Sequence, residues 1–112
     1  MGRLTTHILD TAGGCPATGV KVQVFTVAED ARRLSASAET NADGRVDQPL
    51  IAEGDLQNGI YEIDFHIGAY FAARKMESFL DVVTVRFSAT ASECYHVPLL
   101  VSPFGYSTYR GS

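Results

Sequence analysis

The sequence has 112 residues, of which 46% are hydrophobic and 20% are charged, and this composition excludes a disordered or collagen-like chain and fits one folded domain spanning residues 1–112. The formal net charge is −4 and the Lys and Arg residues are scattered, which argues against nucleic acid or an anionic membrane surface as a partner. Because no apolar run approaches the roughly 18 residues of a membrane span and the N-terminal residues lack the apolar core of a signal peptide, we expect a cytoplasmic protein.

Alternation of apolar and polar residues is the dominant pattern, and it predicts β-strands because successive side chains of a strand point to opposite faces. Runs of this kind, rich in β-branched and aromatic residues, cover 4–10, 20–27, 33–40, 61–67, 81–89, 93–100 and 105–111. Clusters of Gly, Pro, Asn and Asp lie between the runs, at 11–19, 41–45, 57–59 and 102–105, and predict turns. The pattern therefore predicts at least seven strands.

Residues 68–78, GAYFAARKMES, depart from this alternation. Aromatic and basic residues recur there at a spacing of three to four, and the Ala residues are good helix formers. We therefore predict a short helix between two strands. Strand-length runs separated by turns favour an antiparallel sandwich over alternating strands and helices.

Cys15 and Cys94 are the two cysteines. They lie far apart and match neither a metal-binding spacing nor the dense disulfide framework of a small secreted domain. We interpret them as two free thiols in a reducing compartment.

Three histidines are available as acid–base groups near neutral pH, because an unperturbed imidazole has a pKa of about 6.5. In the run 4–10, His7 shares a face with Leu9, and in the run 93–100, His96 shares a face with Leu100. Both histidines should therefore project away from the sandwich core. The apolar residues beside them favour a face that another subunit covers.

A histidine on the polar face of a strand is more often solvated or hydrogen-bonded than catalytic. His66 shares its face with Asp64 and Glu62, a pattern typical of an ordinary solvent-exposed surface. Arg45 would by default be a solvent-facing turn residue, and Arg110 a tail charge. There is no phosphate-binding loop, zinc spacing or nucleophile elbow, so the residues alone leave open both a solvated surface and an acid–base site of two histidines and an arginine.

Residues 96–109, HVPLLVSPFGYSTY, are unusually apolar and aromatic for the end of a chain, because termini are commonly polar and frayed. We therefore expect the tail to be buried. Together, LTTHILDTAGGCPATGVKV (4–22), NADGRV (41–46) and HVPLLVSPFGYSTYRGS (96–112) make the chain similar, over essentially its whole length, to 5-hydroxyisourate hydrolase, the enzyme branch of the transthyretin-related proteins.

This resemblance implies a transthyretin-like antiparallel β-sandwich of two four-stranded sheets with one short α-helix, assembled as a homotetramer, with an eighth strand near residues 44–50. It also implies hydrolysis of 5-hydroxyisourate, the product of urate oxidation, to 2-oxo-4-hydroxy-4-carboxy-5-ureidoimidazoline, without cofactor or metal, in a site between facing subunits. The family's motif residues correspond to His7, Arg45, His96, Tyr109, Arg110, Gly111 and Ser112.

Under this resemblance, His7 and His96 form a proton-transfer pair, with the roles of the two left open. Arg45 binds substrate oxygens and steadies negative charge. Ser112, by its hydroxyl or its carboxylate, orients a histidine, the water or the substrate. The wall of the substrate site is completed by Tyr109, Arg110 and Gly111. Tyr109 and Arg110 hold the tail in place, and Gly111 allows close approach of the backbone because it has no side chain.

Two other functions stay open. One is a transthyretin-like carrier that binds an aromatic ligand in a channel between subunits, although transthyretin itself lacks the terminal tetrapeptide and these histidines. The other is a structural module presented to a protein partner. The histidines, Arg45 and the tetrapeptide favour the hydrolase, because a passive apolar channel does not need them.

Overall fold

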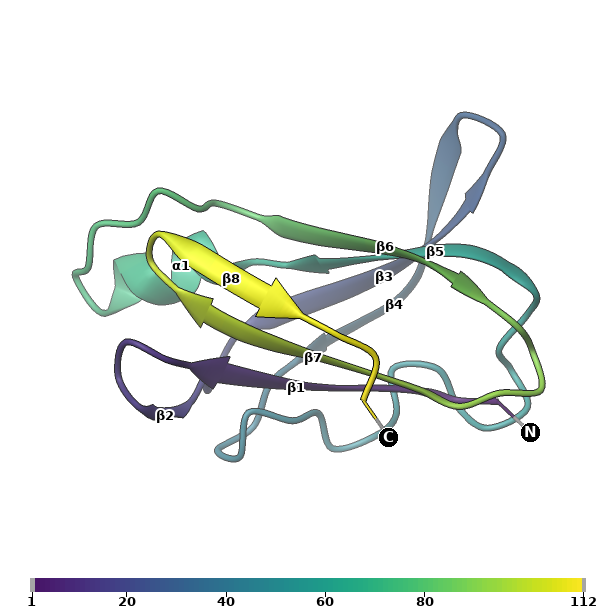
Figure 1. Cartoon of the computed structure of the whole chain (residues 1–112), viewed down its shortest axis with the longest axis horizontal. Coiled ribbons are helices and arrows are strands. Elements are labelled where there is room, and N and C mark those ends of the chain that lie inside the picture. The colour runs from purple at the N-terminus through teal and green to yellow at the C-terminus, as the bar shows by residue number, and fades with distance from the viewer. Residues whose placement is uncertain (1, 112) are drawn as a thin grey trace.

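In the computed structural model, which describes residues 2–111, β-strands form two sheets that pack face to face (Figure 1). One sheet has the order β2 (Cys15–Pro16), β1 (Leu4–Asp10), β7 (Tyr95–Ser102) and β8 (Gly105–Thr108). The other has the order β4 (Ala31–Glu39), β3 (Lys21–Ala28), β5 (Gly59–Phe65) and β6 (Val83–Ala89). A short helix, α1 (Ile67–Ala73), follows β5. The predicted all-β sandwich of two four-stranded sheets with one short helix is confirmed.

Each of the seven runs predicted as strands overlaps a strand, but the eighth strand is not where we expected it. It is β2, whereas residues 44–50 form bends and irregular structure. Two backbone hydrogen bonds explain the error: Ile8 N–H donates to the Gly44 carbonyl at 2.8 Å, and Leu4 N–H donates to the Ile51 carbonyl at 3.0 Å. Residues 44–51 therefore span the same distance as residues 4–8. The longer segment must bow outward and cannot be extended.

The central pair of the first sheet, β1 and β7, is parallel, whereas the other strand pairs are antiparallel. In this pairing Thr5 lies opposite His96, and Leu9 lies opposite Leu100. Residues that share a face on β1 therefore have direct neighbours on β7. This register sets which side chains meet on the outer face of the sheet.

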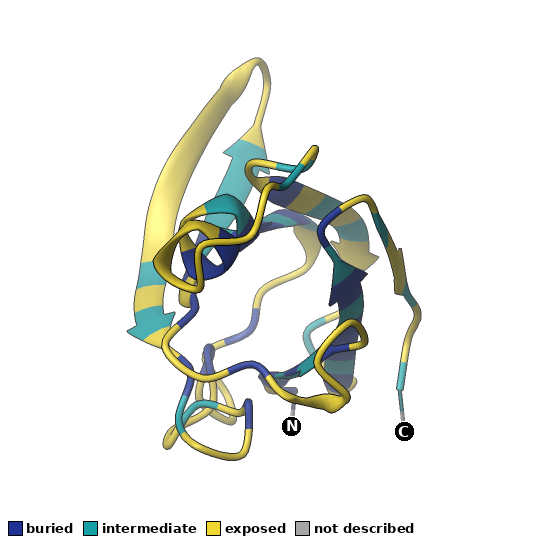
Figure 2. Ribbon diagram, turned by 90° about the vertical axis from the view of Figure 1, so that its left-hand side faces the viewer, coloured by how far each residue is buried: buried dark blue, intermediate teal, exposed yellow. Residues whose placement is uncertain are grey.

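Alternation along the strands builds the core. In β1, Leu4 and Ile8 are fully buried between the sheets, while Thr5 and His7 are half-buried on the outer side. Phe65 is among the largest fully buried side chains, and burying a side chain of this kind contributes about 1.5–3 kcal/mol. The hairpin of β3 and β4 projects beyond the sandwich (Figure 1), and the ribbon coloured by burial shows that much of it is exposed (Figure 2).

The helix is shorter than the predicted 68–78 because its C-terminus is closed by a specific motif. Lys75 adopts a positive φ of 59°. Its N–H donates to the Ala72 carbonyl, and Met76 N–H donates to the Phe71 carbonyl, each at 3.0 Å. These two bonds form a Schellman motif, which ends a helix.

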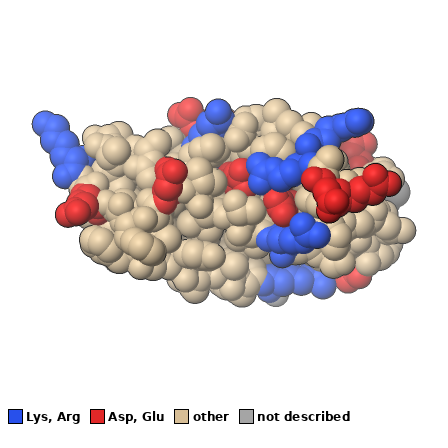
Figure 3. Space-filling view, turned by 90° about the horizontal axis from the view of Figure 1, so that it is seen from above, with Lys and Arg blue, Asp and Glu red and all other residues tan. Residues whose placement is uncertain are grey.

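The outer face of the second sheet carries an ion-pair network and lies away from the predicted site. Arg32 contacts Asp64 at 2.7 Å and Glu62 at 3.0 Å, and Arg86 contacts Glu62 at 3.1 Å. His66 lies on this face and hydrogen-bonds Gln23. Basic and acidic side chains are intermixed on the surface seen in Figure 3. Within residues 2–111, no helix is long and apolar enough to cross a membrane.

Candidate active site

His7 and His96 lie on the outer face of the first sheet, on the neighbouring strands β1 and β7. His96 is opposite Thr5, and His7 is two residues further along the same face of β1. Both imidazoles are half-buried. The two histidines are therefore diagonal neighbours across a strand pair, close enough for long side chains to interact.

Arg45 is brought to the same place by the turn 41–45. The Gly44 carbonyl accepts the Ile8 N–H at 2.8 Å, which holds the turn against the edge of β1. Gly44 has φ +75°, and a Cβ there would lie 2.4 Å from the Ile8 carbonyl oxygen, so only glycine fits. The side chain of Asn41 stiffens the turn, because its Oδ1 accepts the N–H groups of Asp43 at 2.9 Å and Arg45 at 3.2 Å.

His7 is bound to this same turn. Its Nε2 lies 2.9 Å from the carbonyl oxygen of Asp43. A carbonyl only accepts hydrogen bonds, so His7 donates through Nε2–H. The bond joins an early strand to a mid-chain turn and leaves the other ring nitrogen, Nδ1, outside this contact.

His96 is held by Thr5, whose Oγ1 lies 2.9 Å from Nδ1 of the imidazole. Burial lowers the pKa of His96 below its ordinary value of 6.5, and the charges of Arg45 and His7 lower that pKa further. Both effects favour the neutral form of the His96 imidazole. Arg45 and His7 therefore both lie within electrostatic reach of His96.

The tail returns to His96 after a break in β8. The strand ends at Thr108, and the register from Thr108 opposite Leu99 continues to Gly111 opposite His96. Between these points Tyr109 faces Pro98, which has no N–H to donate, so the ladder is interrupted there. Gly111 N–H then donates to the His96 carbonyl at 2.7 Å, and a Cβ on Gly111 would lie 2.6 Å from Cδ2 of the imidazole. The close approach expected at Gly111 is present.

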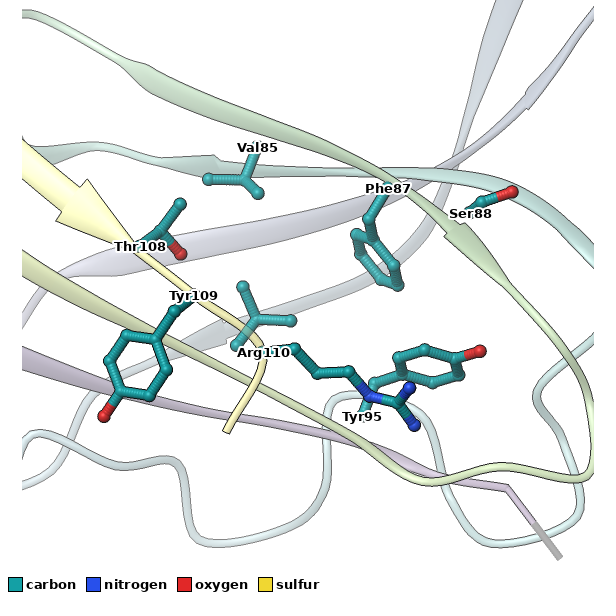
Figure 4. Close-up of a pocket in the computed structure, with 8 residues that line it drawn as sticks. Val85, Phe87, Ser88, Tyr95, Thr108, Tyr109 and Arg110 are labelled. Carbon is teal, nitrogen blue, oxygen red and sulfur yellow. The ribbon is translucent and has the colours of Figure 1, made fainter. Parts of the chain in front are cut away.

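Arg110 points to the opposite side of the sheet, into the edge of the sandwich. Its guanidinium lies 4.4 Å from the centroid of the Tyr95 ring, donates to the Cys94 carbonyl at 3.1 Å and pairs with Glu93 at 3.2 Å. Figure 4 shows Arg110 and Tyr109 pointing in opposite directions. Within the chain, Arg110 therefore anchors the tail and does not join the histidines.

The pocket in Figure 4 is distinct from the histidine site. It has a volume of about 320 Å³ and opens between β6, β7 and the tail, with Val85, Phe87, Tyr95 and Arg110 among its lining residues. None of His7, Arg45 and His96 lines it. The histidines instead occupy an open face of the chain, and among residues 2–111 no three His, Cys, Asp or Glu side chains converge as metal ligands.

The structure thus brings together four of the residues expected from the sequence: His7, Arg45, His96 and Gly111. In the apolar stretch 96–109, Val97, Leu99 and Val101 are buried, whereas Tyr106 is 48% exposed and Tyr109 is 59% exposed. The expectation of burial is therefore confirmed for β7 and wrong for the residues after it, in the chain alone. Ser112 lies outside the described residues. Sequence reasoning missed Thr5, although it shares the face of His7. It also missed the Asp43 carbonyl, because a backbone group leaves no signal in residue identities.

The arrangement offers a neutral imidazole, a second imidazole and a guanidinium to a polar molecule. An imidazole can move protons near neutral pH, and the planar fork of a guanidinium binds pairs of oxygens or spreads negative charge.

Comparison with known proteins agrees with this chemistry. The sequence profile described as the HIUase/Transthyretin family matches residues 4–111. A protein of Deinococcus radiodurans described as 5-hydroxyisourate hydrolase is 53% identical over 113 residues, covering 97% of this chain and 95% of the relative.

Solved structures support the fold. The structure of Klebsiella pneumoniae 5-hydroxyisourate hydrolase matches with a TM-score of 0.85 and 36% identity, over 98% of this chain and 99% of that one. Sea bream transthyretin in complex with thyroxine matches with a TM-score of 0.90 and 31% identity, over 97% of this chain and 94% of that one. The transthyretin-like character of the sandwich is confirmed.

Proposed function

The chain belongs to the HIUase/Transthyretin family, and on that premise we propose that it is a 5-hydroxyisourate hydrolase. The observation that carries the proposal is the meeting of His7, His96 and Arg45 on one outer face of β1 and β7. One relative described as this hydrolase is 53% identical, and among the solved structures the Klebsiella hydrolase is 36% identical against 31% for sea bream transthyretin.

The reaction is the addition of water to an amide carbonyl of the substrate ring, with cleavage of the ring C–N bond. One imidazole accepts a proton from water, and the leaving nitrogen gains a proton. The product is 2-oxo-4-hydroxy-4-carboxy-5-ureidoimidazoline, formed in urate catabolism. Burial and neighbouring charge lower the pKa of His96 and so favour its neutral form, and two neighbouring imidazoles disfavour both being charged at once.

Arg45 binds oxygens of the flat substrate and stabilises the negative charge that develops on the carbonyl. It is exposed on the surface of the chain and held beside β1 by Gly44. A guanidinium suits this task better than the point charge of lysine, because its planar fork can meet two oxygens.

The tail completes the site wall through its backbone. Gly111 lies against the His96 imidazole, and Arg110 supports it from the other side of the sheet. Tyr109, on the outer side, borders the substrate, and Ser112 orients a histidine, the water or the substrate. These two roles rest on the family resemblance.

We further propose that the site is completed between subunits of a homotetramer. Leu9 and Leu100 are cross-strand partners on the same outer face as the histidines. Together with the exposed Tyr109, they give this face an apolar margin that a second copy would cover. A cytoplasmic location is supported by the exposed thiol of Cys15, which a reducing compartment maintains.

The proposal is tested with 5-hydroxyisourate generated freshly from urate. The hydrolase should accelerate the loss of many equivalents of this compound per subunit. A carrier would change the signal by no more than about one equivalent per site and would leave the rate of decay in excess substrate unaltered. That second result would favour the carrier, which now rests only on the structural likeness to transthyretin.

A further inference from the structure

The two imidazoles are held by opposite ring nitrogens. His7 is bound through Nε2, by the Asp43 carbonyl at 2.9 Å, and His96 is bound through Nδ1, by Thr5 Oγ1 at 2.9 Å. In a neutral imidazole the nitrogen that makes the structural bond decides what the other nitrogen offers. The two histidines therefore present different atoms to a molecule on the outer face.

For His7 the carbonyl determines the tautomer. Because the Asp43 oxygen only accepts, neutral His7 carries its proton on Nε2. Its Nδ1 then has a free lone pair and can accept a proton.

For His96 the partner is a hydroxyl, which can donate or accept. If Thr5 donates to Nδ1, the proton of neutral His96 is on Nε2, and the ring offers a donor. If Thr5 accepts, His96 offers a second lone pair. Amide hydrolysis needs one base for the water and hydrogen-bond donors for the developing oxyanion. Only in the first arrangement do the two imidazoles supply one of each, so that His96 shares the stabilisation of the oxyanion with Arg45.

We propose that Thr5 is a positioning residue that donates to Nδ1 of His96, so that His96 offers Nε2–H to the substrate oxygen while His7 moves the proton through Nδ1. This assignment rests on the proposed hydrolase function. Water loses a proton to Nδ1 of His7 as its oxygen bonds to the carbonyl carbon. The same proton then passes from His7 to the ring nitrogen as the C–N bond breaks, which returns His7 to its neutral form.

The surroundings of His96 fit this role. The charges that reach it come from Arg45 on the 41–45 turn and from His7 on β1, and both disfavour a protonated ring. The charged side chain of the tail, Arg110, turns to the opposite face and pairs with Glu93. A neutral imidazole that donates a hydrogen bond is an established way to stabilise an oxyanion.

The first test is NMR of the ligand-free wild-type protein above pH 7, where the correlations between ring nitrogens and ring protons distinguish the two neutral tautomers. We expect Nε2–H for both His7 and His96. A His96 ring protonated at Nδ1 would overturn the proposal. This measurement does not depend on turnover, so it separates the orientation of the rings from the hydrolase function.

The second test compares Thr5→Val with Thr5→Ser. Valine keeps the shape but removes the donor, so the turnover of 5-hydroxyisourate should fall roughly tenfold, the usual effect of one lost hydrogen bond. The pKa of His96 should rise, because a donor to Nδ1 favours the neutral ring. Serine should restore both. A pKa that falls in Thr5→Val would mean that Thr5 accepts, and would contradict the proposal.

The matched control is Thr6→Val, on the core face of the same strand. Thr6 Oγ1 donates to the Val97 carbonyl at 2.7 Å, so its loss removes a hydroxyl from β1 without touching His96. We expect a stability change but an unaltered His96 titration. If wild-type protein shows the expected tautomers but does not hydrolyse 5-hydroxyisourate, the hydrolase function fails. If it hydrolyses the compound and Thr5→Val does so equally well, the role of Thr5 fails.

Discussion

The N–H of Gly111 donates to the carbonyl of His96 at 2.7 Å, and the α-carbon of this glycine lies against the imidazole ring. The contact is the point where the tail rejoins the first sheet after Pro98 interrupts the ladder. The contact therefore links the position of Gly111 to the position of the His96 imidazole, a candidate catalytic group.

Gly111→Ala should therefore lower turnover of 5-hydroxyisourate. The added Cβ would lie 2.6 Å from Cδ2 of His96, so either the ring or the tail must move. Displacement of a catalytic group by about 1 Å can cost on the order of 10²-fold in rate. Steady-state kinetics on the purified variant measure the loss.

The matched control is Gly105→Ala. The nearest atom to a Cβ at Gly105 is Ser102 Oγ at 3.9 Å, so alanine fits without displacement. Full activity in both variants would mean that the tail does not constrain His96.

Arg45→Gln should raise the pKa of His96. The Arg45 charge lowers this pKa in addition to burial, so its removal makes protonation easier. Arg45→Lys keeps the charge, and the pKa should stay near the wild-type value while turnover falls because the planar fork is lost. NMR titration of the His96 ring gives the pKa, and parallel kinetics give the turnover. If the pKa of His96 is the same in Arg45→Gln and in the wild type, Arg45 does not act on His96 and does not belong to the site.

Arg110→Gln should loosen the tail without a large change in global stability. The ion pair with Glu93 is exposed and worth about 1 kcal/mol or less, whereas the guanidinium also stacks on Tyr95 and bonds the Cys94 carbonyl. Hydrogen exchange of the Gly111 amide should become faster, since its bond to His96 then opens more easily. Unchanged exchange would show that Arg110 does not anchor the tail.

Asp64→Asn should flatten the dependence of stability on acid pH. Burial favours the protonated carboxyl, but hydrogen bonds from Arg32 and Thr84 outweigh burial and lower the pKa of Asp64 below 3.8. The stability from this shift is present above the unfolded-state pKa and is lost as pH falls through the folded-state pKa.

Denaturant unfolding near neutral pH should show a loss of about 1–3 kcal/mol for Asp64→Asn, the range for a hydrogen bond to a charged group. Arg86→Gln, which removes only the exposed arm of the same network, should cost less than about 1 kcal/mol. Equal acid sensitivity in wild type and Asp64→Asn would contradict this account of the network.

Much of the fold follows from local pattern. Alternation placed His7 and His96 on outer faces, because a period of two needs only neighbouring residues. It could not reveal that β1 and β7 pair in parallel, since that contact joins segments about ninety residues apart. The docking of the 41–45 turn on Ile8 is likewise a tertiary contact.

The tail shows the other limit. Its apolar composition predicted burial, yet Tyr109 is mostly exposed in the chain, because the tail runs along the edge of the first sheet, beside β7 alone. Arg110 alternates to the inner side, as a strand residue would, and finds partners there. The identity of those partners depends on packing between β7 and the tail, which composition does not encode.

The most direct test of the site is the rate of 5-hydroxyisourate hydrolysis by wild type, His7→Asn, His96→Asn and the control His66→Asn. His66 is bonded to Gln23 on the second sheet and serves as a histidine outside the site. We predict that His7→Asn and His96→Asn each lose at least about 10²-fold in kcat/KM, and that His66→Asn stays near wild type. Wild-type rates in either of the first two variants would contradict the assignment of the histidine pair.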